Sequence, residues 1–128
     1  MADRATLLAL AARAEAGGDA TLSDDVWRAR GWEPRLMGWY HKQSFSHIRG
    51  PRPNLAESID AQEALPGRIV EVRHGDVSGH GDKVMWHARA MQDDDMGWRT
   101  TFAPTEPLAR LAARLRAMAA AQEARDGQ

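Results

Sequence analysis

The chain has 128 residues, of which 43% are apolar and 27% are charged, and its formal net charge is −1. These values are typical of one soluble globular domain, and they exclude strong attraction of nucleic acid by the molecule as a whole. The absence of cysteine excludes disulfides, thiol nucleophiles and cysteine-ligated zinc. No window approaches the roughly 20 apolar residues of a membrane helix, and the acidic residues of the N-terminal segment are unlike a signal peptide. We therefore expect a cytoplasmic protein.

The N-terminal part of the chain is predicted to form two helices and then an irregular segment. Four apolar residues recur there at helical spacing: Leu7, Leu10, Ala11 and Ala14. This stripe predicts a helix over residues 3–16. A shorter helix is predicted over 24–30, with Ser23 as its N-cap and Trp27 on its buried side. Residues 32–53 contain three prolines and two glycines, so we expect an irregular segment with at most one short strand.

The C-terminal part combines a short helix, three strands and a long helix. The short helix is predicted over 55–65, capped at Asn54 or at Ser58. Alternating apolar and polar residues then predict three strands: 68–74, 83–91 and 97–102. Their short connections predict an antiparallel meander with one dry face. An apolar stripe after an N-cap at Thr105 predicts the last helix over 106–122.

These elements predict a single α+β domain over residues 1–128. We expect an antiparallel sheet of three to four strands packed between α-helices. Three tryptophans are expected in the core: Trp27, Trp86 and Trp98. Trp39 and Tyr40 are expected to be partly exposed.

Several of these segments carry a resemblance to a known family. An acidic pair precedes an apolar-aromatic step in SDDVW (23–27), and a short helix ends in Leu-Pro-Gly within NLAESIDAQEALPG (54–67). Ala-Pro-Thr-Glu then leads into the closing helix in FAPTEPLARLAARLRAM (102–118). In this order the segments resemble the phage alpha-beta-alpha sandwich, a small phage-associated domain, over nearly the whole chain. The chain departs from the family pattern in its basic segment 28–53 and in its HGD-rich loop.

This resemblance implies a sheet covered by helices, an alpha-beta-alpha sandwich, and a gene carried by a phage or prophage. The family has no established enzymatic activity. The resemblance therefore implies no catalytic residue.

Residues 74–82 read HGDVSGHGD and contain four groups of metal-binding type: His74, Asp76, His80 and Asp82. A metal site would need several of them to converge, with His87 as a further candidate. No zinc or calcium loop pattern fits their spacing. The three glycines of the loop are explained by turn conformations, so we favour a solvated hairpin connection without a metal or cofactor. A metal-dependent enzyme that uses this loop is the second alternative function.

His87 and Arg89 fall on the strand face opposite Trp86. They would form an exposed polar strip, or would lie under a second helical layer if the sheet were covered on both faces. No nucleotide-binding loop or nucleophile motif accompanies them. We therefore predict no catalytic residue and no enzymatic activity.

The stretch from residue 28 to 52 carries six cationic side chains against a single carboxylate, Glu33, and interleaves them with aromatic residues. Cations neutralise phosphates, and Trp, Tyr and Arg carry much of the binding energy at protein interfaces. In another interpretation the aromatic residues hold the segment to the core while the cations face water. The predicted partner-binding residues are Arg28, Arg30, Arg35, Trp39, Tyr40, Lys42, Arg49 and Arg52.

We therefore expect a small accessory protein, encoded by a phage or prophage, that binds a macromolecule in the bacterial cytoplasm. A protein is the favoured partner because the net charge is nearly neutral. Phage accessory genes of this size often modulate host machinery or block host defence, and anti-CRISPR activity belongs to this class. Nucleic acid, bound by residues 28–52, is the first alternative partner. The oligomeric state stays open.

Overall fold

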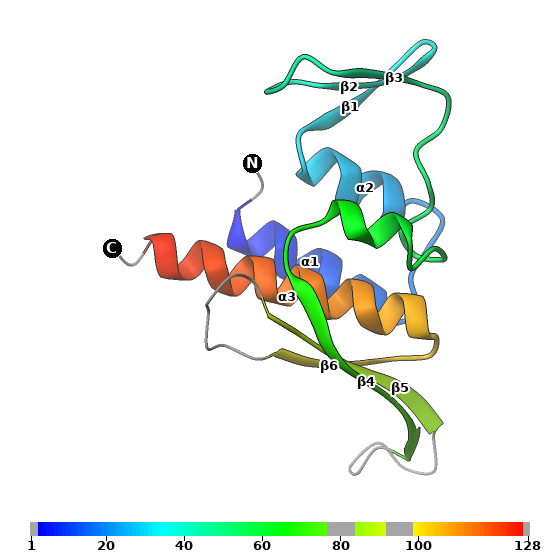
Figure 1. Ribbon diagram of the computed structural model, residues 1–128, viewed down its shortest axis with the longest axis vertical. Helices are drawn as coiled ribbons and strands as arrows, with labels where there is room; N and C mark the ends of the chain where they lie inside the picture. Colours follow the sequence, from blue (N-terminus) through cyan, green and yellow to red (C-terminus); the bar gives the residue numbers. More distant parts are fainter. Residues whose placement is uncertain (1–2, 77–83, 92–98, 127–128) are drawn as a thin grey trace.

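The computed structural model describes residues 3–76, 84–91 and 99–126. Its regular elements are, in chain order, α1 (Arg4–Glu15), α2 (Leu22–Ala29), β1 (Trp32–Arg35), β2 (Gly38–His41), β3 (His47–Arg49), η1 (Ala61–Ala64), β4 (Arg68–Asp76), β5 (Val84–Met91), β6 (Arg99–Ala103) and α3 (Glu106–Asp126). The strands form two antiparallel sheets, β1-β2-β3 and β4-β5-β6, and the helices lie between them (Figure 1). The expected α+β class is confirmed.

Helix α3 lies across one face of the β4–β6 sheet and supplies much of the core. Its expected stripe is buried: Leu108, Leu111, Ala112, Leu115 and Met118. Small residues such as Ala88 and Ala109 let the sheet and the helix approach closely, and the Thr101 hydroxyl donates to the Ala109 carbonyl at 2.7 Å. The N-cap is confirmed, because Thr105 Oγ1 accepts a hydrogen bond from the Leu108 N–H at 3.4 Å. The expected meander with one dry face is confirmed as well.

Helix α1 packs against α3, so the first and last helices of the chain lie side by side (Figure 1). The stripe predicted for this helix is buried: Leu7, Leu10, Ala11 and Ala14. The helix begins after Asp3, whose carboxylate accepts from the Thr6 N–H at 2.8 Å. At the other end, Arg116 Nε donates to Glu15 Oε1 at 2.7 Å and joins the two helices.

The helix predicted over 55–65 is wrong, because the chain forms separate turns followed by the short 3₁₀ helix η1. Both candidate caps act, but each closes a turn of its own. The Asn54 side chain accepts from the Ala56 N–H at 2.9 Å, and the Ser58 hydroxyl accepts from the Ala61 N–H at 3.1 Å. Such local bonds compete with the backbone ladder of a longer helix.

The buried amide of Gln62 further stabilises this turn segment. Its Nε2 donates to the Leu55 carbonyl at 2.8 Å and to the Pro107 carbonyl at 2.7 Å. The Leu55 carbonyl, which a regular α-helix would use four residues later, therefore has a side-chain donor instead.

Ser23 was expected to cap the second helix, and this expectation is wrong. Helix α2 begins two residues earlier than predicted, at Leu22, and Ser23 is buried inside its first turn. The Ser23 hydroxyl accepts from the Leu55 N–H at 2.8 Å and lies 3.3 Å from the Pro53 carbonyl, to which it donates. Ser23 therefore fixes the returning chain to the helix, while Trp27 is buried as expected.

The expectation of an irregular segment over 32–53 is also wrong, because three short strands pair there. The turn at 36–37 lacks the glycine and asparagine typical of two-residue hairpins, and Pro34 interrupts the first strand, so the signal in the sequence was weak. Gly38 allows the close approach of β2 and β3. A Cβ added there would lie 2.0 Å from the Ile48 carbonyl oxygen.

Candidate partner-binding surface

The register of the β1–β3 sheet sorts its side chains onto two faces. Directly opposed residues share a face, and neighbours along a strand point to opposite faces. Trp39 of β2 lies opposite Ile48 of β3. The next residue, Tyr40, lies opposite Glu33 of β1 and His47 of β3. We call the face that contains Trp39 the inner face and the other the outer face, whose residues are Glu33, Arg35, Tyr40, Lys42, His47 and Arg49.

The inner face belongs to the core. Trp39 is 6% exposed and is part of the same buried cluster as Trp27. Beside it, the rings of Trp32 and His41 meet edge to face with their centroids 4.9 Å apart. The expected partial exposure of Trp39 is therefore wrong, because its strand position directs the indole into the core.

Arg52 lies beneath the sheet and not on its outer face. Its guanidinium carbon is 3.9 Å from the ring centroid of Trp27 and 4.4 Å from that of Trp32. A cation between two indoles gains from both ring faces, and burial lowers the pKa of the Arg52 guanidinium. Arg52 thus links helix α2 to strand β1.

The outer face carries the four remaining strand and turn residues of the predicted set: Arg35, Tyr40, Lys42 and Arg49. The Glu33 carboxylate pairs with the Arg35 guanidinium and lies 3.4 Å from Lys42 Nζ. Arg35 also lies over the Tyr40 ring, 5.0 Å from its centroid. Three cations against one carboxylate leave this face positive, and exposed ion pairs of this kind are weak enough to exchange for a partner's carboxylates.

Large apolar side chains are exposed on the same sheet. All four that are exposed in the described ranges lie between residues 36 and 48: Leu36 at 98%, Met37 at 67%, Phe45 at 76% and Ile48 at 39%. Leu36 and Met37 form the β1–β2 turn, and Phe45 lies in the β2–β3 connection with a φ of 57°. A left-handed backbone is costly for an aromatic residue. None of these four residues belongs to the predicted partner-binding set, because a three-stranded sheet with exposed turns was not expected there.

Arg28 lies on helix α2 and Arg30 is its C-cap, so neither residue belongs to the paired strands. Arg28 is 3.3 Å from the Asp25 carboxylate. Arg30 is partly buried, and burial lowers the pKa of its guanidinium. The predicted set of eight therefore divides into an outer face of four residues, two residues on α2, and two residues packed beneath the sheet.

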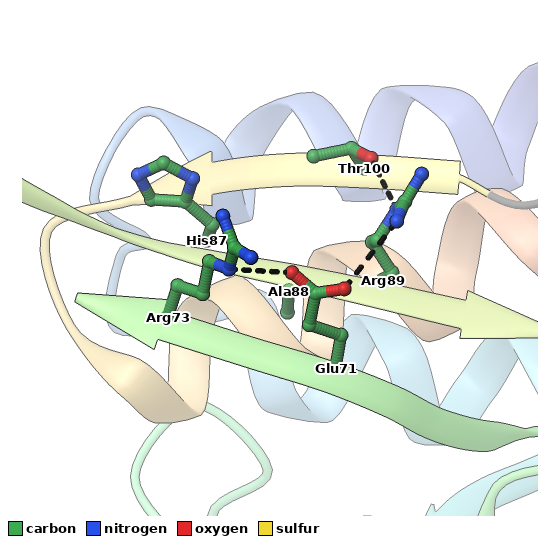
Figure 2. Close-up of a pocket in the computed structure, with 6 residues that line it drawn as sticks. All are labelled: Glu71, Arg73, His87, Ala88, Arg89 and Thr100. Carbon is green, nitrogen blue, oxygen red and sulfur yellow. Dashed lines mark hydrogen bonds and ion pairs between the residues drawn. The ribbon is translucent and has the colours of Figure 1, made fainter. Parts of the chain in front are cut away.

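A second polar surface lies on the face of the β4–β6 sheet that α3 does not cover (Figure 2). Glu71 lies between two guanidiniums, with its Oε1 2.7 Å from Arg73 Nε and its Oε2 3.3 Å from Arg89. Arg89 Nε also donates to Thr100 Oγ1 at 3.2 Å. These residues and His87 line a concavity of about 200 Å³.

The charged side chains that line this concavity already pair with one another. The Glu71 carboxylate already lies between the two guanidiniums, where a bound anion would otherwise lie. His87 meets Phe102 edge to face at 4.9 Å, and in the described part of the chain its buried Nε2 has no hydrogen-bond partner. His87 and Arg89 are both partly exposed and lie in a polar strip, which is closer to the first of the two expected arrangements than to the second.

The HGD segment is described only in part. The ring of His74 stacks on that of Trp86 with centroids 4.4 Å apart, and strand β4 continues to Asp76. His80 and Asp82 lie outside the described residues, as does Trp98. Within the residues that are described, no three histidine or acidic side chains gather as metal ligands.

Comparisons of the chain with family models, with curated proteins and with solved structures yield no match. The resemblance to the phage alpha-beta-alpha sandwich thus stays a prediction. Among the helices that are described, none has the length and apolar character needed to cross a membrane.

Proposed function

We propose that the protein acts by binding another protein through the outer face and the turns of the β1–β3 sheet. The observation that carries the proposal is the distribution of exposed apolar side chains: in the described residues, all the large ones lie in the turns and strands of this one sheet. Large exposed apolar side chains confined to one small sheet indicate an interaction site. Arginine and tyrosine beside them, such as Arg35 and Tyr40, are typical of interface hot spots.

The charge of the outer face indicates an acidic surface on the partner. Arg35, Lys42 and Arg49 outnumber Glu33, whereas the whole chain has a net charge of −1. A protein surface that presents a few carboxylates together with apolar side chains would match this surface. A nucleic acid could stack a base on Phe45 but would offer little apolar contact to Leu36 and Met37, so it is the less favoured partner.

The proposed role is that of an accessory protein that acts by occupying a surface of its partner and catalyses no reaction. If the family resemblance holds, the gene belongs to a phage or prophage and the partner is a protein of the bacterial cytoplasm. Inhibition of a host defence, such as a CRISPR effector, fits a small protein of this kind. This role rests on the resemblance alone.

Affinity purification from a bacterial lysate tests the proposal. The wild-type protein should retain one stoichiometric protein, and the double variant Arg35→Glu/Arg49→Glu should lose it, with affinity for the purified partner lowered at least about tenfold. The matched control is Arg73→Glu, which reverses an exposed cation on the other sheet and should bind as the wild type does.

Two results would count against the proposal. Equal retention by the double variant and by the control would remove the outer face from the interaction. Retention of nucleic acid instead, with a log–log salt slope of several units, would support the alternative partner.

A further inference from the structure

We infer that strand β3 is an open sheet edge that takes an extended segment of the partner as a fourth strand, with acidic and apolar residues in alternation. This inference rests on the proposed function and names its binding mode and the chemistry of the partner segment. Extended peptides add to exposed sheet edges in many complexes, where main-chain hydrogen bonds give affinity and alternate side chains give specificity.

The backbone hydrogen bonds show which groups of β3 are free. The His41 N–H donates to the Ser46 carbonyl at 2.8 Å, and the Gly50 N–H donates to the Met37 carbonyl at 3.1 Å. Even-numbered residues of this strand therefore direct their backbone groups toward β2. Because backbone direction alternates along a strand, His47 and Arg49 direct theirs toward the open edge. All three residues of β3 are exposed, and β2 is its only neighbour among the described strands.

The opposite edge of the same sheet is closed to such pairing. The Lys42 N–H donates to the Gly31 carbonyl at 3.1 Å. In strand β1 the odd-numbered residues therefore direct their backbone groups toward β2, and the even-numbered residues direct theirs outward. Pro34 is one of these outward residues, and it has no N–H to donate. Helix α2 also packs near β1. The sheet thus has one blocked edge and one open edge.

The two faces of the sheet define the incoming segment. A strand added beside β3 would place alternate residues on the outer face, next to His47 and Arg49. Carboxylates at these positions would neutralise the excess positive charge of that face. The residues between them would lie on the inner face beside Ile48, which is 39% exposed and would be covered by apolar side chains. Alternating acidic and aliphatic residues satisfy both requirements.

A second copy of the chain fits this edge poorly. Antiparallel pairing of two β3 strands about Ile48 would bring the cations of the two outer faces, including Arg49 of each copy, close together. Like charges opposite one another destabilise a strand pair. The partner's acidic segment is therefore the preferred occupant.

A peptide probe tests the inference without knowledge of the partner. The probe is a capped peptide of alternating glutamate and valine, and the control replaces each glutamate by lysine. In amide exchange measured by NMR on the full-length protein, the acidic peptide should slow exchange of the His47 and Arg49 N–H groups at least about tenfold, and the lysine peptide should not. N-methylation of every second residue of the acidic peptide should abolish the protection. Equal effects of the three peptides, or none, would overturn the inference.

A matched pair of variants separates backbone pairing from side-chain contact. His47→Ala keeps the outward N–H and should bind the acidic peptide nearly as the wild type does. His47→Pro removes that N–H and should weaken binding at least about tenfold, while the protected Trp39 N–H reports that the sheet is intact. Equal binding by the two variants would contradict strand addition. Concentration-dependent dimerisation that only His47→Pro abolishes would assign the edge to a second copy and also overturn the inference.

The two proposals can fail separately. If Arg35→Glu/Arg49→Glu releases the partner but His47→Pro does not, the outer face binds the partner and the β3 edge does not. If the acidic peptide protects His47 and Arg49 while the charge-reversed variant retains the lysate partner, the edge accepts a strand but the proposed function fails.

Discussion

The two sheets of this protein have the same number of strands and the same antiparallel pairing, yet they differ in how they are held. The β4–β6 sheet buries one face against α3, and small residues such as Ala88 and Thr101 are fully enclosed there. The β1–β3 sheet has only Trp39 fully in the core and leaves Leu36, Met37 and Phe45 in solvent. Strand pairing alone therefore does not distinguish the two sheets; the placement of their apolar side chains does, and it is the basis of the binding role proposed for the β1–β3 sheet.

The β1–β3 sheet is attached to the rest of the protein through a few specific contacts. Arg52 lies between the indoles of Trp27 and Trp32, and Ser23 holds the chain that leaves the sheet. Such an attachment costs little apolar area, so the apolar residues of the turns stay available for a partner. We expect the two sheets to differ in local stability accordingly.

The largest expected effect on stability comes from the comparison of two leucines at opposite extremes of exposure. Leu111→Ala, at a fully buried position of α3, should lower the free energy of unfolding by about 2–5 kcal/mol because it removes core contacts and leaves a cavity. Leu36→Ala, at a residue 98% exposed, should change it by less than about 0.5 kcal/mol. Urea denaturation followed by tryptophan fluorescence measures both. A loss above 2 kcal/mol in Leu36→Ala would mean that the turn is packed in solution and is no free surface.

The next effect is that of the serine that fixes the chain leaving the β1–β3 sheet. Ser23→Ala should cost about 1–3 kcal/mol, because the buried Leu55 N–H loses its acceptor. Ser58→Ala is the control, since it removes a similar bond to the Ala61 N–H at a less enclosed site and should cost less. Equal losses in the two variants would show that burial of the Leu55 bond adds nothing.

Removal of the cation beneath the sheet should loosen one sheet and spare the other. Arg52→Ala should cost about 1–2 kcal/mol, since the two indoles lose their cation. Amide exchange should accelerate at Trp39 and stay unchanged at Ala88. Arg52→Lys should restore only part of the protection, because an ammonium cannot stack on both rings as a planar guanidinium does. Faster exchange at Ala88 as well would mean that the two sheets unfold together.

The smallest effect concerns the acid response of the link between α1 and α2. Arg13 bonds Asp19 at 2.7 Å and Asp25 at 2.8 Å, and its guanidinium holds the pKa of the Asp19 carboxyl well below its usual range. A lowered pKa in the folded state stabilises the protein above the unfolded value, roughly 4, and this stabilisation is lost as the pH falls through the folded value. Asp19→Asn should therefore be less stable than the wild type at pH 7, and the difference should shrink below pH ~4. Urea midpoints at pH 7 and pH 3 test this, and 1 M salt at pH 7 should reduce the difference as well. A difference that is independent of pH would exclude the carboxylate charge as its cause.

The sequence was informative wherever burial follows a local period. The stripes of α1 and α3, the N-cap at Thr105 and the strands of the β4–β6 sheet all follow from spacing along the chain. The helix expected over 55–65 failed because Gln62 and Ser58 take hydrogen bonds that a helix would use. Such competition depends on Pro107, 45 residues away, and cannot be read from local spacing.

The candidate surface was found only in part for a similar reason. Tyr40 and Lys42 are two residues apart and so share a face, and Arg35 and Arg49 reach it through pairing across the strands. Recognition of a strand over 38–41 would have separated Trp39 from Tyr40 by alternation alone. The position of Arg52 between two tryptophans depends on the packing of α2 and was not accessible from the sequence.

The packing of α1 on α3 also determines when the protein can finish folding during synthesis. Arg116 bonds Glu15 across a separation of 101 residues, and the apolar stripe of α1 is buried against the last helix of the chain. Until the ribosome has released α3, Leu7 and Leu10 have no permanent cover, and the β4–β6 sheet lacks the helix that fills its dry face. Contacts of such long range slow folding and leave apolar surface open to other chains while they form. The nascent chain therefore exposes the apolar stripe of α1 and the dry face of the sheet until α3 emerges.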